Sequence, residues 1–193
     1  FIFITMEAPI ITFTTAAEWE QWLAKNHTQT VGVWLKMYKK GSGISGITYP
    51  EALDEALCYG WIDGQKKSND TESFLQKFTP RRAKSNWSQI NTKHIDRLTK
   101  AGKMKPTGIR EVEAAKADGR WERAYAAGSE ATVPEDFLKA LKKNKKAKEF
   151  YETLNKQNKF AIYFRLHNAV KPETRVRRVA AIIEKLERNE KFY

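Results

Sequence analysis

The stretch that decides the fold runs from Cys58 to Asn91 and reads CYGWIDGQKKSNDTESFLQKFTPRRAKSNWSQIN. Two runs with strand character, Gln65 to Ser68 and Ser73 to Phe78, flank the Asn69-Asp70 pair, which favours a tight turn. Pro80 has no amide hydrogen to give to a strand ladder, so it ends the second run. The pattern predicts a β-hairpin followed by a basic loop.

Helix and strand patterns continue on both sides of this hairpin. Upstream, Thr15-Ala16-Ala17-Glu18 is a capping box for a helix that ends near Asn26, and the alternation from 31 to 37 predicts a strand. A second box, Thr48-Tyr49-Pro50-Glu51, opens another helix. Downstream, the spacing predicts a helix over 88–101 and helices from Thr132 to the end.

This order of elements places the chain in the α+β class. We expect a small antiparallel sheet of about three strands packed with helices, followed by an all-helical C-terminal region. The predicted domains are 6–128, which carries the Gly60–Gly64, Phe78–Arg82 and Ser85–Ser88 blocks, and 129–193. Residues 1–5 precede the first methionine, so we set them aside from the fold argument.

Composition limits the compartment and the partners. No apolar run is long enough to span a bilayer, and no secretory leader is visible, so we expect a cytoplasmic protein. The lone Cys58 has no internal disulfide partner, which agrees with a reducing compartment. The net charge is +12, of which +3 falls in residues 1–102 and +9 in residues 103–193. Such a balance attracts anionic partners, although excess lysine also serves solubility.

Motifs for known chemistry are missing. The three histidines are scattered, with no ligand at metal-binding spacing, so we expect no metal site and no cofactor. Cys58 lies at the C-terminal end of a predicted helix, where the helix dipole disfavours a thiolate. Asp63 is more suited to capping a turn than to acting as a general base. We therefore assign no catalytic residue, and the question of an enzyme stays open.

The strongest candidate chemistry is anion recognition at the start of the helix near Ser88. Helix N-termini present free N–H groups, and arginine donates bidentately to phosphate or carboxylate. An aromatic ring can stack on a ligand there. The predicted ligand-binding residues are Asp63, Lys66, Arg81, Arg82, Ser85, Trp87, Ser88, Asn91, Arg175 and Arg178. The structural alternative is that the serines cap the helix, the tryptophan is core and the arginines pair with nearby carboxylates.

Several blocks of this sequence resemble one known family. The blocks are Ala56–Gly64, Phe78–Arg82, Ser85–Asn91, Gly119–Tyr125, Val133–Pro134 and the closing Glu173–Arg178. Together they are similar to the YdeI/OmpD-associated family over about 19–186. The resemblance implies a bacterial cytoplasmic protein whose helical C-terminal region is of the bacteriocin-protection type. It carries over no catalytic residues. The chain departs from the family pattern at Lys77, where arginine is expected, and at Asn69, where an apolar residue is expected.

Three hypotheses about function follow. The first is a non-enzymatic binding or protection module that recognises an anionic small molecule or an acidic protein through the residues around Arg81. The second is an enzyme acting on a small phosphorylated or carboxylated substrate with Asp63 or Cys58. The third is nucleic-acid binding by the basic C-terminal helices, which we rank lower because their aromatic residues are committed to helix faces.

Overall fold

The computed structural model describes residues 7–193, so the segment 1–5 that was set aside lies outside the described residues. The chain forms two compact units, Phe1–Ala124 (unit 1) and Tyr125–Tyr193 (unit 2). The sequence analysis placed the corresponding border after residue 128. Each unit has its own hydrophobic core and is described separately.

Unit 1 contains four strands and four helices among its described residues. In chain order they are β1 (Ile10–Ile11), α1 (Ala16–Asn26), β2 (Val33–Tyr38), α2 (Tyr49–Cys58), β3 (Trp61–Ser68), β4 (Ser73–Pro80), α3 (Gln89–Lys100) and α4 (Pro106–Ala117). Both capping boxes form: Thr15 and Glu18 cap α1, and Thr48 and Glu51 cap α2. The expected α+β class is therefore confirmed.

The sheet differs from the expected one in a single strand. Its order is β1-β2-β4-β3, in which β2, β4 and β3 are antiparallel and β1 is parallel to β2. The expectation of three antiparallel strands was wrong for β1. That strand has two residues, Ile10 and Ile11, too few to show a periodic pattern in the sequence. Ile10 and Ile11 count as a strand because they pair with Trp34 and Leu35 of β2.

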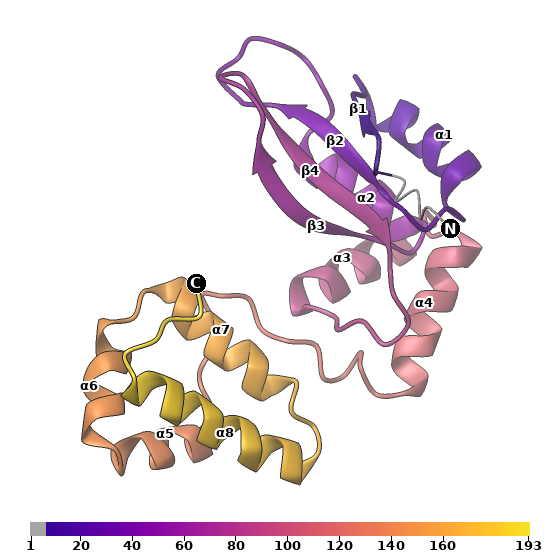
Figure 1. The fold of residues 1–193 in the computed structure, drawn as a ribbon. Coiled ribbons are helices and arrows are strands. Elements are labelled where there is room, and N and C mark those ends of the chain that lie inside the picture. Colours follow the sequence, from indigo (N-terminus) through magenta and orange to yellow (C-terminus); the bar gives the residue numbers. More distant parts are fainter. Residues whose placement is uncertain (1–6) are drawn as a thin grey trace, which may run out of the picture. The chain divides into compact units, whose positions relative to one another are not determined.

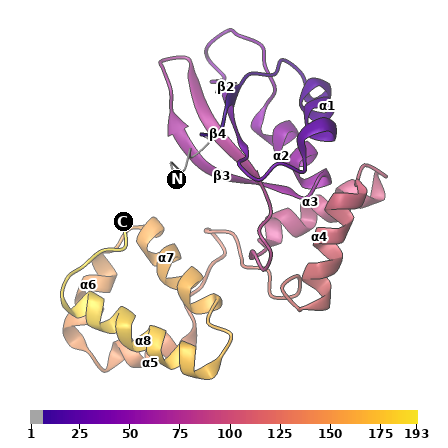
Figure 2. The ribbon, with the colours of Figure 1, turned by 45° about the vertical axis from the view of Figure 1, so that its right-hand side comes forward.

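Helices cover one face of the sheet. In both ribbon views α1 and α2 lie on the same side, and no helix of the described part of unit 1 lies on the other (Figures 1 and 2). The covered face packs on a tryptophan-rich core: Trp19 stacks on Trp22 at 5.2 Å between ring centroids, and Trp61 meets both edge-on. The indole N–H of Trp19 donates to the carbonyl of Ala52 and so links α1 to α2.

The chain between α3 and unit 2 is stiffened by one proline. Pro106 is the first residue of α4, where its missing amide hydrogen costs nothing. The stretch 121–127 after α4 forms turns and loop.

Unit 2 is all helical, as expected. It consists of α5 (Glu135–Lys142), α6 (Lys145–Thr153), α7 (Lys156–His167) and α8 (Pro172–Glu187). Phe137, Leu141, Ile162, Leu166 and Leu186 are the large side chains of its core. No helix among residues 7–193 has both the length and the apolar character that crossing a membrane requires.

Candidate functional site

The loop after β4 holds Arg81 inside unit 1. Its guanidinium carbon lies 3.4 Å from the ring centroid of Trp87, and its Nη1 donates to the Ser85 hydroxyl and to the carbonyl of Asn86, both at 3.3 Å. Arg81 is 7% exposed and Trp87 is 2% exposed. The structure thus brings Arg81, Ser85 and Trp87 together, in an arrangement that packs the loop against the start of α3.

A second arginine fixes the same loop from the other side. Arg120 donates through Nη1 to the carbonyl of Ser85 at 2.9 Å, and its Nε binds the carboxylate of Asp118. The ring of Trp121 lies 5.0 Å from that of Trp87. This arginine was absent from the predicted set, because its contact with residue 85 joins parts of the chain that are distant in sequence.

The remaining predicted residues near α3 divide into capping and surface positions. Ser88 caps the helix, since its hydroxyl accepts from the amide of Asn91 at 3.1 Å. Both residues are buried. Arg82 is exposed next to the packed Arg81. Ser88 therefore has the capping role that the sequence analysis named as its alternative to ligand binding.

Asp63 and Lys66 lie on β3, at some distance from that loop. The Asp63 carboxylate accepts from the hydroxyl of Tyr49 at 2.9 Å. The ammonium group of Lys66 lies 4.0 Å from the ring centroid of Phe74. A register shift between Asp63 and Lys66 marks a bulge in the β3–β4 pairing. The structure gives Asp63 a hydroxyl partner on α2.

Arg175 and Arg178 lie in unit 2, where both tie helices together. Arg175 makes two hydrogen bonds to the Asp136 carboxylate, at 2.7 and 2.8 Å, and a third to the carbonyl of Leu166. Arg178 donates to the carbonyl of Arg165. These contacts join α8 to α5 and α7. Both half-buried arginines therefore have hydrogen-bond partners within unit 2.

Removing the Arg175 side chain is expected to destabilise unit 2 at neutral pH. Arg175→Ala should lower its free energy of unfolding by about 1 kcal/mol, a modest value because Asp136 is half exposed. The hydrogen bonds from Arg175 lower the pKa of the Asp136 carboxyl. The ion pair therefore stabilises above the unfolded aspartate pKa of about 4, and this contribution is lost as pH falls through the folded pKa.

The measurement is denaturant unfolding at several pH values. Far-UV circular dichroism follows both units, whereas tryptophan fluorescence follows unit 1 alone, because all six tryptophans lie within it. The gap between wild type and Arg175→Ala should narrow from pH 7 to about pH 2. A gap that is as wide in acid as at neutral pH would contradict the role given to this ion pair.

Cys58 is badly placed to act as a nucleophile. It is fully buried at the end of α2. Burial, with Glu55 and Asp54 nearby, raises the pKa of the thiol to about 12, so the thiolate is scarce at neutral pH. Among residues 7–193 no group of three or more histidine, cysteine, aspartate or glutamate side chains is arranged to hold a metal ion.

The sheet face that the described helices of unit 1 leave uncovered gathers lysines around a tryptophan. We call it the open face; it carries Trp34, Lys36 and Tyr38 of β2, Leu75 and Lys77 of β4, and Lys67 of β3. Cross-strand partners point to the same side of an antiparallel sheet, and Trp34 pairs with Lys77 while Leu75 pairs with both Lys36 and Lys67. The alternate β2 residues, Val33, Leu35 and Met37, enter the core.

Trp34 lies at the centre of this charge. The ammonium group of Lys67 lies 4.5 Å from its ring centroid and that of Lys77 lies 5.5 Å from it. Trp34 is 9% exposed. Within the described residues neither Lys67 nor Lys77 forms an ion pair, whereas Lys36 lies 3.5 Å from Asp70. Among the described residues, the charges of Lys67 and Lys77 on the open face thus have no acidic partner.

The sequence analysis missed the open face. It predicted the β2 strand but did not ask which residues of the hairpin would lie beside Trp34. The pattern Trp34-x-Lys36-x-Tyr38 was the available indication, because alternating aromatic and basic residues on one face of a strand suit a solvated, anion-facing surface.

Comparison with protein families divides the chain in the same two parts. Residues 11–111 match the family described as Domain of unknown function (DUF8412). Residues 130–189 match the family described as Bacteriocin-protection, YdeI or OmpD-Associated, so the resemblance to that family is confirmed. The matched range lies in unit 2, while the blocks around Trp61 and Arg81 fall in the range of the first family. Searches of curated proteins and of solved structures found no match.

Proposed function

The chain belongs to the family described as Domain of unknown function (DUF8412), and we propose that it is a binding protein for phosphate-bearing anions. The ligand lies on the open face of unit 1, against Lys67, Lys77 and Lys36. The observation that carries this proposal is the pair of lysine ammonium groups held over the single ring of Trp34. The protein acts by binding and not by catalysis.

Electrostatics favours a ligand at this place. The ammonium groups of Lys67 and Lys77 lie 4.5 and 5.5 Å from the centroid of one ring, so an anion bound over that ring is attracted by two positive charges. The tryptophan ring attracts both cations electrostatically, so the charges are arranged before the ligand arrives. The open face is therefore organised for a multiply charged group such as phosphate.

The basic helices of unit 2 are a weaker candidate for the same function. Three of their lysines already face glutamates one turn away: Lys139 faces Glu135, Lys145 faces Glu149 and Lys148 faces Glu152. Such exposed pairs contribute little to stability, but they neutralise much of the local charge. The lysines of unit 2 thus resemble a solvated face more than a binding stripe.

Binding of a labelled oligonucleotide tests the proposal. A fluorescein-labelled dT oligonucleotide of about 12 residues supplies a chain of phosphates, and its fluorescence anisotropy reports the complex at about 50 mM salt. Three lysine–phosphate contacts predict that the logarithm of the binding constant falls with the logarithm of the salt concentration with a slope of about −2. Inorganic polyphosphate should compete, because the charge and not the base is recognised. If neither probe forms a complex at low salt, the proposal fails.

A further inference from the structure

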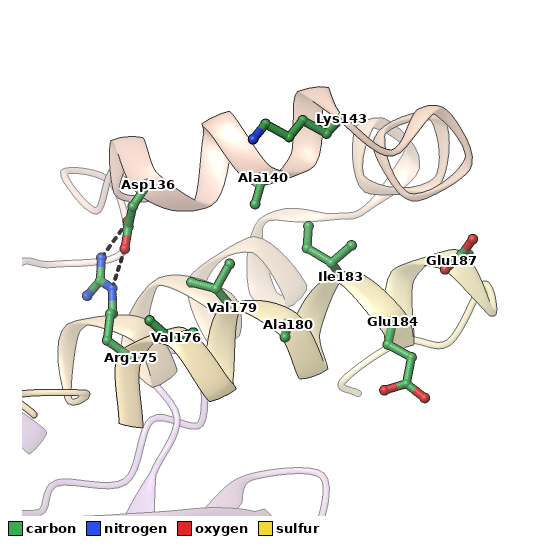
Figure 3. A pocket seen from close by; sticks show the side chains of 10 residues that line it. All are labelled: Asp136, Ala140, Lys143, Arg175, Val176, Val179, Ala180, Ile183, Glu184 and Glu187. Carbon is green, nitrogen blue, oxygen red and sulfur yellow. Dashed lines mark hydrogen bonds and ion pairs between the residues drawn. The ribbon is translucent and has the colours of Figure 1, made fainter. Parts of the chain in front are cut away.

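A groove runs between α5 and α8 on the surface of unit 2. Figure 3 shows its floor, formed by the apolar side of α8, with Ala140 of α5 and the residue that caps this helix, Lys143, opposite. Its volume is about 650 Å³. At one end the ion pair of Asp136 and Arg175 closes it. The residues that line it are Asp136, Ala140, Lys143, Arg175, Val176, Val179, Ala180, Ile183, Glu184 and Glu187.

The floor of the groove is an apolar stripe that faces solvent. Val176, Val179, Ala180 and Ile183 recur at intervals of three and four, so they form one face of α8. Val176 is 71% exposed, while Val179 and Ile183 are half-buried. On the adjoining side of the same helix, Ile182 and Leu186 lie in the core of unit 2, and Val179 and Ile183 pack against that core. The apolar surface of the helix therefore extends beyond the part that unit 2 covers, to the exposed Val176 and Ala180.

We propose that this groove receives α8 of a second copy of the chain, so that the two α8 helices pack antiparallel in a symmetric homodimer. In such a pair each residue contact occurs twice, once in each direction. An antiparallel alignment places Val176 of one copy against Ile183 of the other. Ala180, the small residue at the middle of the stripe, lets the two helix backbones approach closely.

Charge along the edge of the stripe specifies the antiparallel direction. Arg177 and Glu184 are seven residues apart, so they lie on the same flank of α8, away from α5. Both are exposed, with Arg177 towards the N-terminal end and Glu184 towards the C-terminal end. In an antiparallel pair, Arg177 of each copy meets Glu184 of the other. In a parallel two-fold pair this flank of the two copies would lie on opposite sides of the helix pair, so Arg177 and Glu184 would not meet.

The present partner of Glu184 does not prevent this exchange. Glu184 pairs with Arg188 one turn later on the same helix at 2.5 Å, and both side chains are more than half exposed. An exposed pair of this kind is weak, so the carboxylate is free to bridge between copies. On the other flank, the antiparallel arrangement carries Lys143 towards the acidic first turn of α5, Glu135 and Asp136, in the second copy.

Sedimentation of the full chain tests the dimer. The wild type should pass from monomer to dimer as its concentration rises. Val176→Glu should raise the dissociation constant roughly 100-fold, because each dimer then buries two new charges. The position is exposed in the single chain, so the variant should fold, as circular dichroism would show. Lys146→Glu, an exposed charge reversal on α6 outside the groove, is the matched control and should leave the dimer intact.

A charge exchange tests the direction of packing. Arg177→Glu and Glu184→Arg should each weaken the dimer by roughly 10-fold, and the double variant should regain most of the wild-type affinity. A chain that stays monomeric up to about millimolar concentration overturns the proposal. A dimer that Val176→Glu leaves intact overturns the choice of surface. Failure of the double variant to recover overturns the antiparallel pairing.

Discussion

Reversing the two charges over Trp34 is expected to abolish most anion binding. The Lys67→Glu/Lys77→Glu variant should bind the dT oligonucleotide on the order of 100-fold more weakly than wild type at about 50 mM salt. Each lysine–phosphate contact releases condensed counterions, which is worth nearly a factor of ten at that salt concentration, so two lost contacts multiply to this size. The salt slope should become shallower by about 1.4, or 0.7 for each lost contact.

The matched control distinguishes the effect of where the lysines lie from the effect of the net charge of unit 1. Lys25 on α1 and Lys93 on α3 are exposed lysines on helices of unit 1, so Lys25→Glu/Lys93→Glu changes the net charge of unit 1 by the same amount. We expect this variant to keep most of the wild-type affinity and nearly its salt slope. If both double variants lose binding equally, affinity depends on overall charge, and the open face has no special role.

Gly108→Ala is expected to cause a large loss of stability in unit 1. Gly108 lies in the first turn of α4, directly against the C-terminal end of α2. A Cβ there would overlap the carbonyl oxygen of Cys58 and lie 2.9 Å from that of Leu57. Both atoms belong to backbone and cannot rotate away, so the helices must separate. We expect a loss of about 3 kcal/mol and a melting temperature about 10 °C lower.

Tryptophan fluorescence measures this effect cleanly, because every tryptophan reports on unit 1. Gly41→Ala is the control: a Cβ at Gly41 has no neighbour within 4 Å, and its backbone does not adopt a positive φ. Its melting temperature should stay within about 2 °C of wild type. An equally small effect of Gly108→Ala would mean that α4 can shift away from α2 at little cost.

Local sequence predicted most of the elements in this chain. The boxes at Thr15 and Thr48 placed the starts of α1 and α2, because a hydroxyl and a carboxylate three residues apart satisfy the first amides of a helix wherever they occur. The β3–β4 hairpin followed from its Asn69-Asp70 turn, although β3 begins at Trp61, four residues earlier than predicted. Its first residues fall outside the alternating pattern, since the bulge near Asp63 disturbs the pairing there.

The predicted site was harder to judge from the sequence. Arginine, serine and tryptophan near a helix start suit both a ligand and a packed loop, and only the fold shows that Arg81 stacks on Trp87 and bonds to residues 85 and 86. For Arg175, the partner Asp136 lies 39 residues away on another helix. Such pairings depend on how helices meet, which no local pattern encodes.

The amino-acid sequence by itself determined most of the longer helices and strands, because capping, turn chemistry and hydrophobic spacing act within a few residues. The tertiary structure alone decided which lysines share a face with Trp34. The bulge in β3 and the pairing of β2 with β4 turn Lys67 to that face and Lys66 to the other, and a slip of one residue would exchange them. The sequence sets how many charged residues the chain has, whereas the strand register decides which of them lie together on one surface.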